Sequence, residues 1–442
     1  MNEFTKSLCK IAIPVTVQCM LQSSFSIVDQ LMIGQLGKEA VSAVGLCGNF
    51  SLIYSVVMGA VGSVAGILIA QFLGAKDDKE AWRSFTVSGL VGIIISAFFM
   101  LAAFGWSSKI LGLYTNDKLI IKEGTAYLRV IGLAFILMGI NTIISTWLRC
   151  REHASIPLVA SFLSVIVNTL LNYILIFGKF GFQSYEINGA AYATVISQFV
   201  NLLIILLGFI VSLKKDKDYI QLSLHLEKVS FSDYMIMITP ILVSEFLWSL
   251  GQNVESAVYG HLSTESLAAY TVTCPIQGLF CGALSGLSAA AGVMIGKRLG
   301  AKEFDGAFKD AKKIMWVGLV GSVIGAIMLI SLSGPYVSLY QMESSILNLG
   351  RMVLIVFSLY APFKVENMIL GGIIKSGGDT VTIMIIDIIG TWIIGIPLCL
   401  FAAYVLKWQI VGVYTLLTVE EAFRLLTSLV IFQRKNWIKT LT

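Results

Sequence analysis

The sequence is poor in charge and in the residues that build metal or disulfide sites. Only 13% of its 442 residues are charged, against about 25% in a typical soluble domain. It has three histidines and seven scattered cysteines with no CxxC pair, too few ligands for a zinc or haem site. It has no phosphate-binding loop and no catalytic triad. We therefore expect no enzymatic activity, no resident metal and no cofactor other than a coupling ion.

Apolar residues are abundant, at 57% of the chain. A soluble protein of this composition would expose large apolar patches, whereas a lipid bilayer accommodates them. The net charge of +5 contains no basic block of the kind that binds nucleic acid, so none is expected as a partner. The segment 8–33 is too long, and too often interrupted by polar residues, to be a cleavable signal. It is predicted to be a first membrane span.

The apolar runs lack the alternation of strands and are long enough to cross a bilayer as helices. They predict an all-α polytopic membrane protein with twelve spans: 8–33, 41–70, 84–106, 121–147, 155–177, 189–213, 231–259, 266–296, 310–333, 346–373, 380–405 and 410–433. Two six-helix halves follow, 1–213 and 231–442, joined by a cytoplasmic linker over 214–230.

The distribution of Lys and Arg predicts the orientation of the chain. With the N-terminus in the cytoplasm, 21 of the 31 fall in inner segments, 8 in outer segments and 2 within spans. The outer eight are Lys38, Lys109, Lys118, Lys122, Arg129, Lys179, Arg351 and Lys407. Because positive charge is retained on the cytoplasmic side, both termini are expected there, in a plasma-membrane protein.

The two halves resemble each other at a constant offset along the chain. Pro14 aligns with Pro240, and the run Leu73–Lys76 aligns with Leu299–Lys302, both LGAK. Six spans in each half give both the same orientation, the parallel-repeat arrangement of several transporters. Such proteins bind substrate between the halves and move one against the other.

Ionisable residues within spans are candidates for function because burying them is costly. Asp29 shares a helical stripe with Gln18 and Gln22, and its repeat position in the second half is Glu255. Two buried acids facing a cavity attract cations and can exchange protons. Glu245 and Trp248 lie on the same span as Glu255, where the indole could stack on a cation. Glu420 and Arg424 are four residues apart on one predicted helix and are expected to form an ion pair. Asp387 is expected to make a polar contact between helices.

These motifs resemble the multidrug and toxic compound extrusion (MATE) family over nearly the whole chain. The resemblance rests on Val28-Asp29, on Ile33–Gly37, on the two LGAK loops and on Lys375–Thr380, which reads KSGGDT. It implies antiport of drugs or metabolites against protons or sodium. The predicted substrates are amphipathic organic cations, and the transporter is expected to function as a monomer in the bilayer.

The resemblance assigns individual residues unevenly. Asp29 matches the family's first-helix aspartate, and Glu255 its seventh-span glutamate. An Asn-x-x-x-Asp pattern of some members reads Asn168 and Asn172 here, and Thr194 could complete that polar cluster. The predicted ion-coupling residues are therefore Asp29, Asn168, Asn172, Thr194 and Glu255.

A second set of residues is predicted to contact substrate. Where sodium-coupled members add a tenth-span aspartate, this chain has Lys364, with Glu366 two residues later. A lysine there should repel sodium and could pair with Glu255. The predicted substrate contacts are Gln18, Gln22, Glu245, Trp248, Glu255, Lys364 and Glu366.

The sequence leaves two alternative functions open. One is a lipid-linked oligosaccharide flippase of the same superfamily, which needs basic residues in its cavity to hold phosphates. The other is a membrane receptor or scaffold that transports nothing. Uptake of a labelled cation into everted vesicles, with and without a pH gradient, distinguishes all three.

Overall fold

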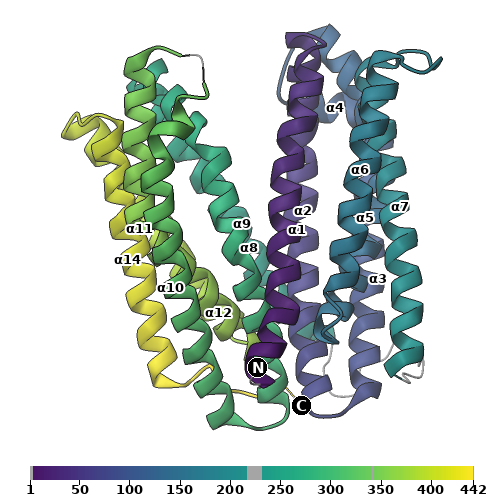
Figure 1. Ribbon diagram of the computed structural model, residues 1–442, viewed down its shortest axis with the longest axis vertical. Coiled ribbons are helices and arrows are strands. Elements are labelled where there is room, and N and C mark those ends of the chain that lie inside the picture. Colours follow the sequence, from purple (N-terminus) through teal and green to yellow (C-terminus); the bar gives the residue numbers. More distant parts are fainter. Residues whose placement is uncertain (1–2, 217–230, 341, 442) are drawn as a thin grey trace. The chain divides into compact units, whose positions relative to one another are not determined.

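The structure is a computed structural model that describes residues 3–216, 231–340 and 342–441. The first half contains α1 (Glu3–Gly34), α2 (Lys38–Gly74), α3 (Asp78–Gly105), the short α4 (Ser107–Gly112), α5 (Lys118–Cys150), α6 (Ser155–Phe177) and α7 (Glu186–Asp216). The second contains α8 (Phe231–Leu262), α9 (Thr264–Gly300), α10 (Phe304–Val337), α11 (Ser344–Ser376) and α14 (Ile410–Arg434). Between α11 and α14 a continuous helical run from Thr380 to Val405 includes α12 (Thr380–Ile388) and α13 (Ile396–Leu400). Within each half the long helices lie side by side along a common direction (Figure 1).

All twelve predicted spans are helices in the part of the chain that the structure describes. Eleven of them are long enough, and contain a sufficiently apolar stretch, to cross a membrane by length and composition alone. The twelfth, α14, is 25 residues long but carries Glu420, Glu421 and Arg424 within two turns. The predicted linker 214–230 falls mostly outside the described residues, since only 214–216 are described, and these continue α7.

The chain divides by its contacts into two compact units. One combines the start of α1, up to Thr16, with Gly74–Lys76 and the second half of the chain. The other runs from Val17 to Leu73 and from Asp77 to the end of α7. The unit that contains α2–α7 has an apolar core between α5, α6 and α7, including Leu148, Ala160 and Ile205. The unit that contains α8–α14 has a larger core around Tyr259, Phe357 and Tyr414.

Equivalent helices of the two halves have equivalent bounds. Thr264–Gly300 begins and ends where Lys38–Gly74 would fall if moved by the offset of the internal repeat, and Ser344–Ser376 corresponds to Lys118–Cys150 in the same way. Lys76 and Lys302, which occupy equivalent positions, both adopt left-handed backbone, with φ of 59° and 60°. The same local turn therefore ends both LGAK segments, which agrees with the internal repeat read from the sequence.

The run from Thr380 to Val405 departs from regular α-helix geometry. It contains two π-helical stretches, Ile389–Gly395 and Phe401–Val405. A Cβ added at Gly390 would overlap the side chain of Arg424, and one added at Gly395 would overlap the carboxyl of Glu420. Only glycine at these positions lets the two charged side chains of α14 approach so closely. The widened helix therefore accommodates a buried ion pair from its neighbour.

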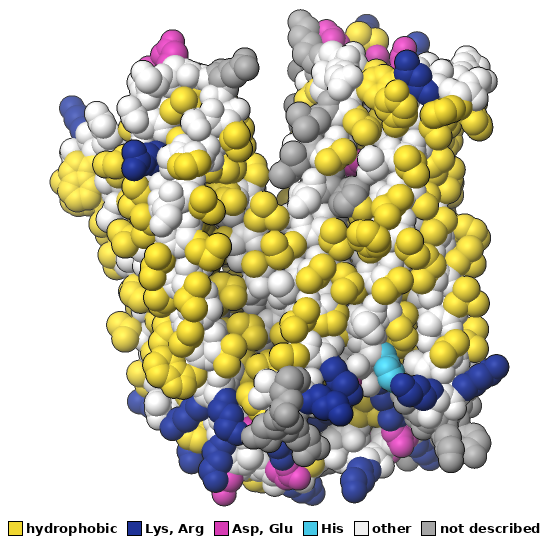
Figure 2. Space-filling view, viewed as in Figure 1, with side chains coloured by type: hydrophobic (Ala, Val, Ile, Leu, Met, Phe, Trp, Pro, Cys, Tyr) yellow, Lys and Arg dark blue, Asp and Glu magenta, His cyan; other side chains and the backbone are white. Residues whose placement is uncertain are grey.

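The surface carries its charge unevenly. In Figure 2 hydrophobic side chains cover the middle of the face shown, while Lys and Arg gather toward one end of the helices. We expect that end to be cytoplasmic because positively charged segments are retained on that side of the membrane. A reporter enzyme that is active only in the cytoplasm, fused after Thr442, should therefore be active. Activity only of a reporter that requires export would reverse the assignment.

Candidate functional site

The first candidate site lies within the unit that contains α2–α7 and is centred on Asp29 of α1. Asn172 on α6 donates its amide to Asp29 Oδ1 at 2.6 Å and to Asn168 Oδ1 at 3.1 Å. Asn168 in turn points its amide at Thr194 Oγ1 and Ser197 Oγ on α7, at 3.4 Å each. Asp29 is half-buried, whereas Asn172 is only 1% exposed. We call Asp29, Asn168, Asn172, Thr194 and Ser197 the Asp29 cluster.

A second contact between α1 and α6 repeats this geometry. Gln18 donates to Ser161 Oγ at 2.8 Å, and Gln18 precedes Asp29 by the same eleven residues by which Ser161 precedes Asn172. Since eleven residues make close to three helical turns, both contacts lie on one face of each helix. The predicted stripe on α1 is thus used to pack against α6. Gln22 is exposed and lies outside these contacts.

The Asp29 cluster is uncharged apart from Asp29 itself. Its other members are amides and hydroxyls, and no lysine or arginine takes part in the hydrogen bonds described above. A carboxylate held by neutral donors keeps its negative charge available to a proton or to a cation. The arrangement can therefore bind either one, but binding one removes the attraction for the other.

The second candidate site lies within the unit that contains α8–α14 and surrounds Glu255, which is 3% exposed. A cavity of about 30 Å³, large enough for a water molecule, lies beside it. Its lining is polar and aromatic: Trp248, Gln252, Glu255, Tyr270, Gln277, Tyr360, Lys364, Tyr414, Leu417, Glu420 and Glu421. We call this the Glu255 cavity.

The three carboxylates of the Glu255 cavity are compensated to different degrees. Glu420 is paired with Arg424 at 2.8 Å, and Glu421 accepts the amide of Asn367 at 2.8 Å. Glu255 accepts one long bond, 3.3 Å, from Gln252, and its Oε1 has no partner among the described residues. Glu255 is thus the carboxylate of this cavity whose charge is least satisfied by the protein.

Tyrosines and one lysine complete the lining of the Glu255 cavity. Tyr360 donates to Tyr414 at 2.8 Å, and Tyr414 to Gln277 Oε1 at 3.0 Å. Lys364 lines the same cavity as Glu255, but the two form no ion pair in the part of the chain described here. The ion pair anticipated from the sequence is therefore absent from this arrangement.

Two of the substrate contacts predicted in the second half do not line this cavity. Glu245 is half-exposed and lies 4.0 Å from Lys375, away from Glu255. Glu366 is buried against α10, where its Oε1 would lie 3.0 Å from a Cβ on Gly318. Lys364 and Glu366 are two residues apart on one helix and so face nearly opposite sides. Only Lys364 of this pair faces the cavity.

Comparison with known proteins identifies the chain. The MatE family model matches residues 14–174 and again 240–401, so the two matches begin at the two prolines that the internal repeat aligns. The chain belongs to the MatE family. This confirms the resemblance seen in the motifs, and the double match of the family model agrees with the internal repeat. This MatE protein is therefore a multi-pass membrane protein of a transporter family.

Individual relatives span the whole chain at low identity. A probable multidrug resistance protein NorM of Thermotoga maritima is 24% identical over 99% of this chain and 94% of its own length. A probable multidrug resistance protein YoeA of Bacillus subtilis is 25% identical over 92% of this chain and 89% of its own. A crystal structure of MATE in complex with MaL6 superposes with a TM-score of 0.89 at 16% identity, covering 98% and 96% of the two chains. The last comparison confirms the predicted fold.

Several residues around both sites were not predicted from the sequence. Ser161 and Ser197 are ordinary serines on apolar helices, and nothing in their spacing singles them out. Gln252 and Tyr360 could have been found, because they precede Glu255 and Lys364 by three and four residues and so share their helix faces. Glu421 adjoins Glu420, which the sequence suggested only as an ion-pair partner.

Proposed function

We propose that this MatE protein is a secondary active antiporter that exports amphipathic organic cations in exchange for protons by alternating access. Two observations support this substrate class. Relatives that span the chain are named probable multidrug resistance proteins. The Glu255 cavity combines an incompletely satisfied carboxylate with aromatic rings, a pairing that attracts cations through charge and through the ring faces.

The observation that carries proton coupling is the neutral surroundings of Asp29. Asn172 holds the carboxylate in place with one amide, and no basic side chain in the Asp29 cluster competes for its charge. A proton that binds Asp29 cancels the charge that would otherwise attract a cation. Antiport requires this exchange of a proton for a cationic substrate, because the proton must leave before the substrate binds and the substrate must leave before the proton binds.

The residues around Glu255 support a different role. Glu420 and Glu421 lie in the same lining, and Lys364 offers them one positive charge there. Glu255 thus serves as a charge contact for the cationic substrate, with Trp248 at the same cavity. Trp248 is 39% exposed, so its ring is accessible to a ligand.

The oligosaccharide flippase is less well supported by this arrangement. Holding a diphosphate linkage calls for several convergent cations, as in other phosphate sites. Among the residues that line the Glu255 cavity, Lys364 is a single cation set against three glutamates. A cavity with this balance of charge favours a cation over a phosphate.

The choice of coupling ion gives a direct test. In everted vesicles, an inside-acid gradient of one pH unit should drive uptake of a labelled monovalent organic cation, because that gradient stores about 1.4 kcal/mol. A one-for-one exchange moves no net charge, so a membrane potential of 100 mV, about 2.3 kcal/mol per charge, should add nothing. A sodium gradient imposed at equal pH should give only background uptake.

A sodium-driven signal at zero pH gradient would contradict proton coupling while leaving cation export intact. Uptake that follows the membrane potential as well as the pH gradient would instead require a second proton per cycle. Absence of any gradient-dependent uptake, across a panel of lipophilic cations, would contradict the export function itself.

A further inference from the structure

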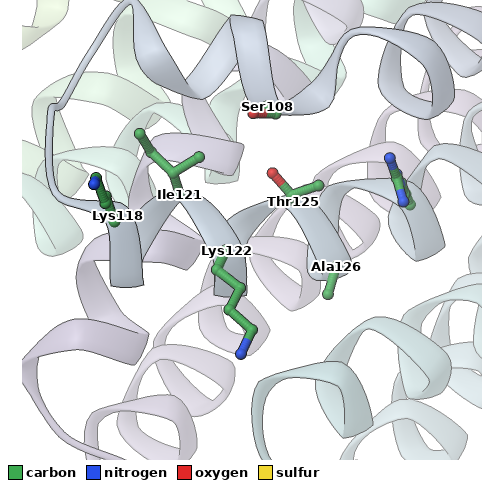
Figure 3. Close-up of a pocket in the computed structure, with 7 residues that line it drawn as sticks. Ser108, Lys118, Ile121, Lys122, Thr125 and Ala126 are labelled. Atoms are coloured by element: carbon green, nitrogen blue, oxygen red, sulfur yellow. The ribbon is translucent and has the colours of Figure 1, made fainter.

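A basic pocket lies on the unit that contains α2–α7, between α4 and the start of α5. Its volume is about 450 Å³, and its lining includes Ser108 on α4 and Lys118, Lys122, Thr125 and Arg129 on α5. Figure 3 shows the Thr125 hydroxyl directed toward α4, where Ser108 lies, and the Lys122 side chain extending away from Ser108. Lysine has a flexible four-carbon stem, so Lys122 can swing toward a ligand between the two helices.

The three cations form one stripe on α5. Lys118, Lys122 and Arg129 are spaced by four and seven residues, which places them on the same helix face. All three side chains are exposed and form no ion pair within the described chain. Thr125, between them, has a hydroxyl oxygen that is shielded from water and has no hydrogen-bond partner there. The pocket therefore offers three unpaired positive charges, and one unpartnered hydroxyl lies beneath them.

The part of α5 that carries the stripe, from Lys118 to Arg129, leaves its cations exposed. On α5, Gly124 lies against Ala43 and Cys47 of α2, and Gly132 against Ala103 of α3. Further along, Asn141 bonds to Gln198 of α7. Gly124 and Asn141 lie on other sides of the helix, whereas Gly132 follows Thr125 by seven residues and shares its face, so α3 packs against this face just beyond Arg129. Between Lys118 and Arg129 the side that carries the cations lies beside the short α4.

The equivalent helix of the second half shows that the fold does not need these cations. α11 has the bounds of α5 moved by the offset of the internal repeat. At the positions of Lys118, Lys122 and Arg129 it carries Ser344, Asn348 and Ile355. A helix of this length and place thus forms without a cation at any of the three positions. The stripe on α5 is therefore available for a role that α11 does not share.

The neighbours of the pocket are typical of a membrane interface. Trp106 and Leu113 at the two ends of α4 are 56% and 85% exposed, and Leu133, one turn beyond Arg129, is 44% exposed. A helix of 33 residues is about 50 Å long, more than the roughly 40–45 Å of a bilayer with its headgroups. The first turns of α5 therefore lie at the level of the headgroups, with apolar surface continuing below them.

We propose that this pocket binds the phosphate of an anionic membrane phospholipid, with the acyl chains lying along the apolar surface beyond Arg129. The cations supply charge-assisted hydrogen bonds to the phosphate oxygens, and the exposed Ser108 hydroxyl can donate to the same group. The Thr125 hydroxyl is shielded from water, so it reaches the phosphate only if its side chain rotates. The continuity of the stripe with the exposed Leu133 favours a lipid over a water-soluble phosphate. The lipid site is independent of the transported substrate.

The test is lipid binding to the purified full chain in a neutral detergent, followed by native mass spectrometry. Phosphatidylglycerol should bind more tightly than phosphatidylcholine. The variant Lys118→Gln/Lys122→Gln/Arg129→Gln should weaken phosphatidylglycerol binding at least about tenfold, given about fivefold per cation at a membrane surface. The matched control Lys179→Gln/Arg351→Gln/Lys407→Gln removes the same charge from other exposed sites and should change binding less than about twofold.

Three outcomes would overturn the lipid site. They are equal losses in the two triple variants, equal binding of the two lipids, and displacement of bound phosphatidylglycerol by millimolar inorganic phosphate. Should the pocket variant fail to fold, Lys122→Gln and Thr125→Val alone decide the question. Each should weaken phosphatidylglycerol binding by a few fold, and unchanged affinity in both would count against the proposal.

Discussion

Asp29→Asn should leave a folded protein that no longer responds to a pH gradient. The asparagine oxygen can still accept the amide of Asn172, which lies 2.6 Å from Asp29 Oδ1, so the contact between α1 and α6 is retained. What is lost is the carboxylate that we propose takes up and releases the proton. Uptake of a labelled cation into everted vesicles under an inside-acid gradient should fall to the level of empty vesicles at equal expression. A matched control is Glu123→Gln, which neutralises a carboxylate on α5 outside the Asp29 cluster.

Glu255→Gln should have a smaller effect of a different kind. If Glu255 contacts the substrate, then its amide variant keeps pH-driven export and loses affinity, by about tenfold for a contribution of about 1.4 kcal/mol. Saturation curves at a fixed pH gradient separate the two behaviours. Asp29→Asn should lower the maximal rate of uptake, whereas Glu255→Gln should raise the substrate concentration that gives half-maximal uptake. Full pH-driven export by Asp29→Asn would exclude that residue from coupling and overturn the site assignment.

Most of the fold could be predicted because membrane helices are specified locally. Each span needs an apolar run long enough to cross the bilayer, and the interrupting charges mark its ends. The LGAK segments show that a local sequence can also specify the turn after a span. The same four residues end with a lysine in left-handed backbone in both halves. The π-helical stretches between Ile389 and Val405 could not be predicted in this way. They depend on Arg424 and Glu420, which approach from another helix.

The candidate sites were predicted only in part, because which residues of a helix face a site also depends on contacts with other helices. The grouping of Asp29, Asn168 and Asn172 could be predicted from the sequence. Asn168 and Asn172 are four residues apart and so share a helix face, and the family pattern associates that face with the first-helix aspartate. Lys364 and Glu366 could not be told apart from sequence, since either could have faced the cavity. Which one does so is decided by the packing of α11 against α10, where Gly318 leaves room for the carboxyl of Glu366. Helix rotation of this kind is set by tertiary contacts.

Arg424→Met should be the most destabilising of the substitutions considered. Arg424 is 7% exposed and lies 2.8 Å from Glu420 and 3.7 Å from Asp387, and it also donates to Thr391. Methionine fills a similar volume but leaves Glu420, itself 6% exposed, without its cation. Removing one partner of a buried ion pair costs about 3–5 kcal/mol, because the remaining charge stays buried and unpaired.

Unfolding of the purified protein in detergent measures this loss, as a lower midpoint in a thermal or denaturant titration. Arg434→Met is the matched control, since it makes the same change at an exposed arginine on the same helix and should move the midpoint little. The double variant Arg424→Met/Glu420→Met removes both charges and should recover part of the stability, because apolar replacement of a whole buried pair is often tolerated. If Arg424→Met is as stable as Arg434→Met, the pair is dispensable. The π-helical stretches beside it would then need another explanation.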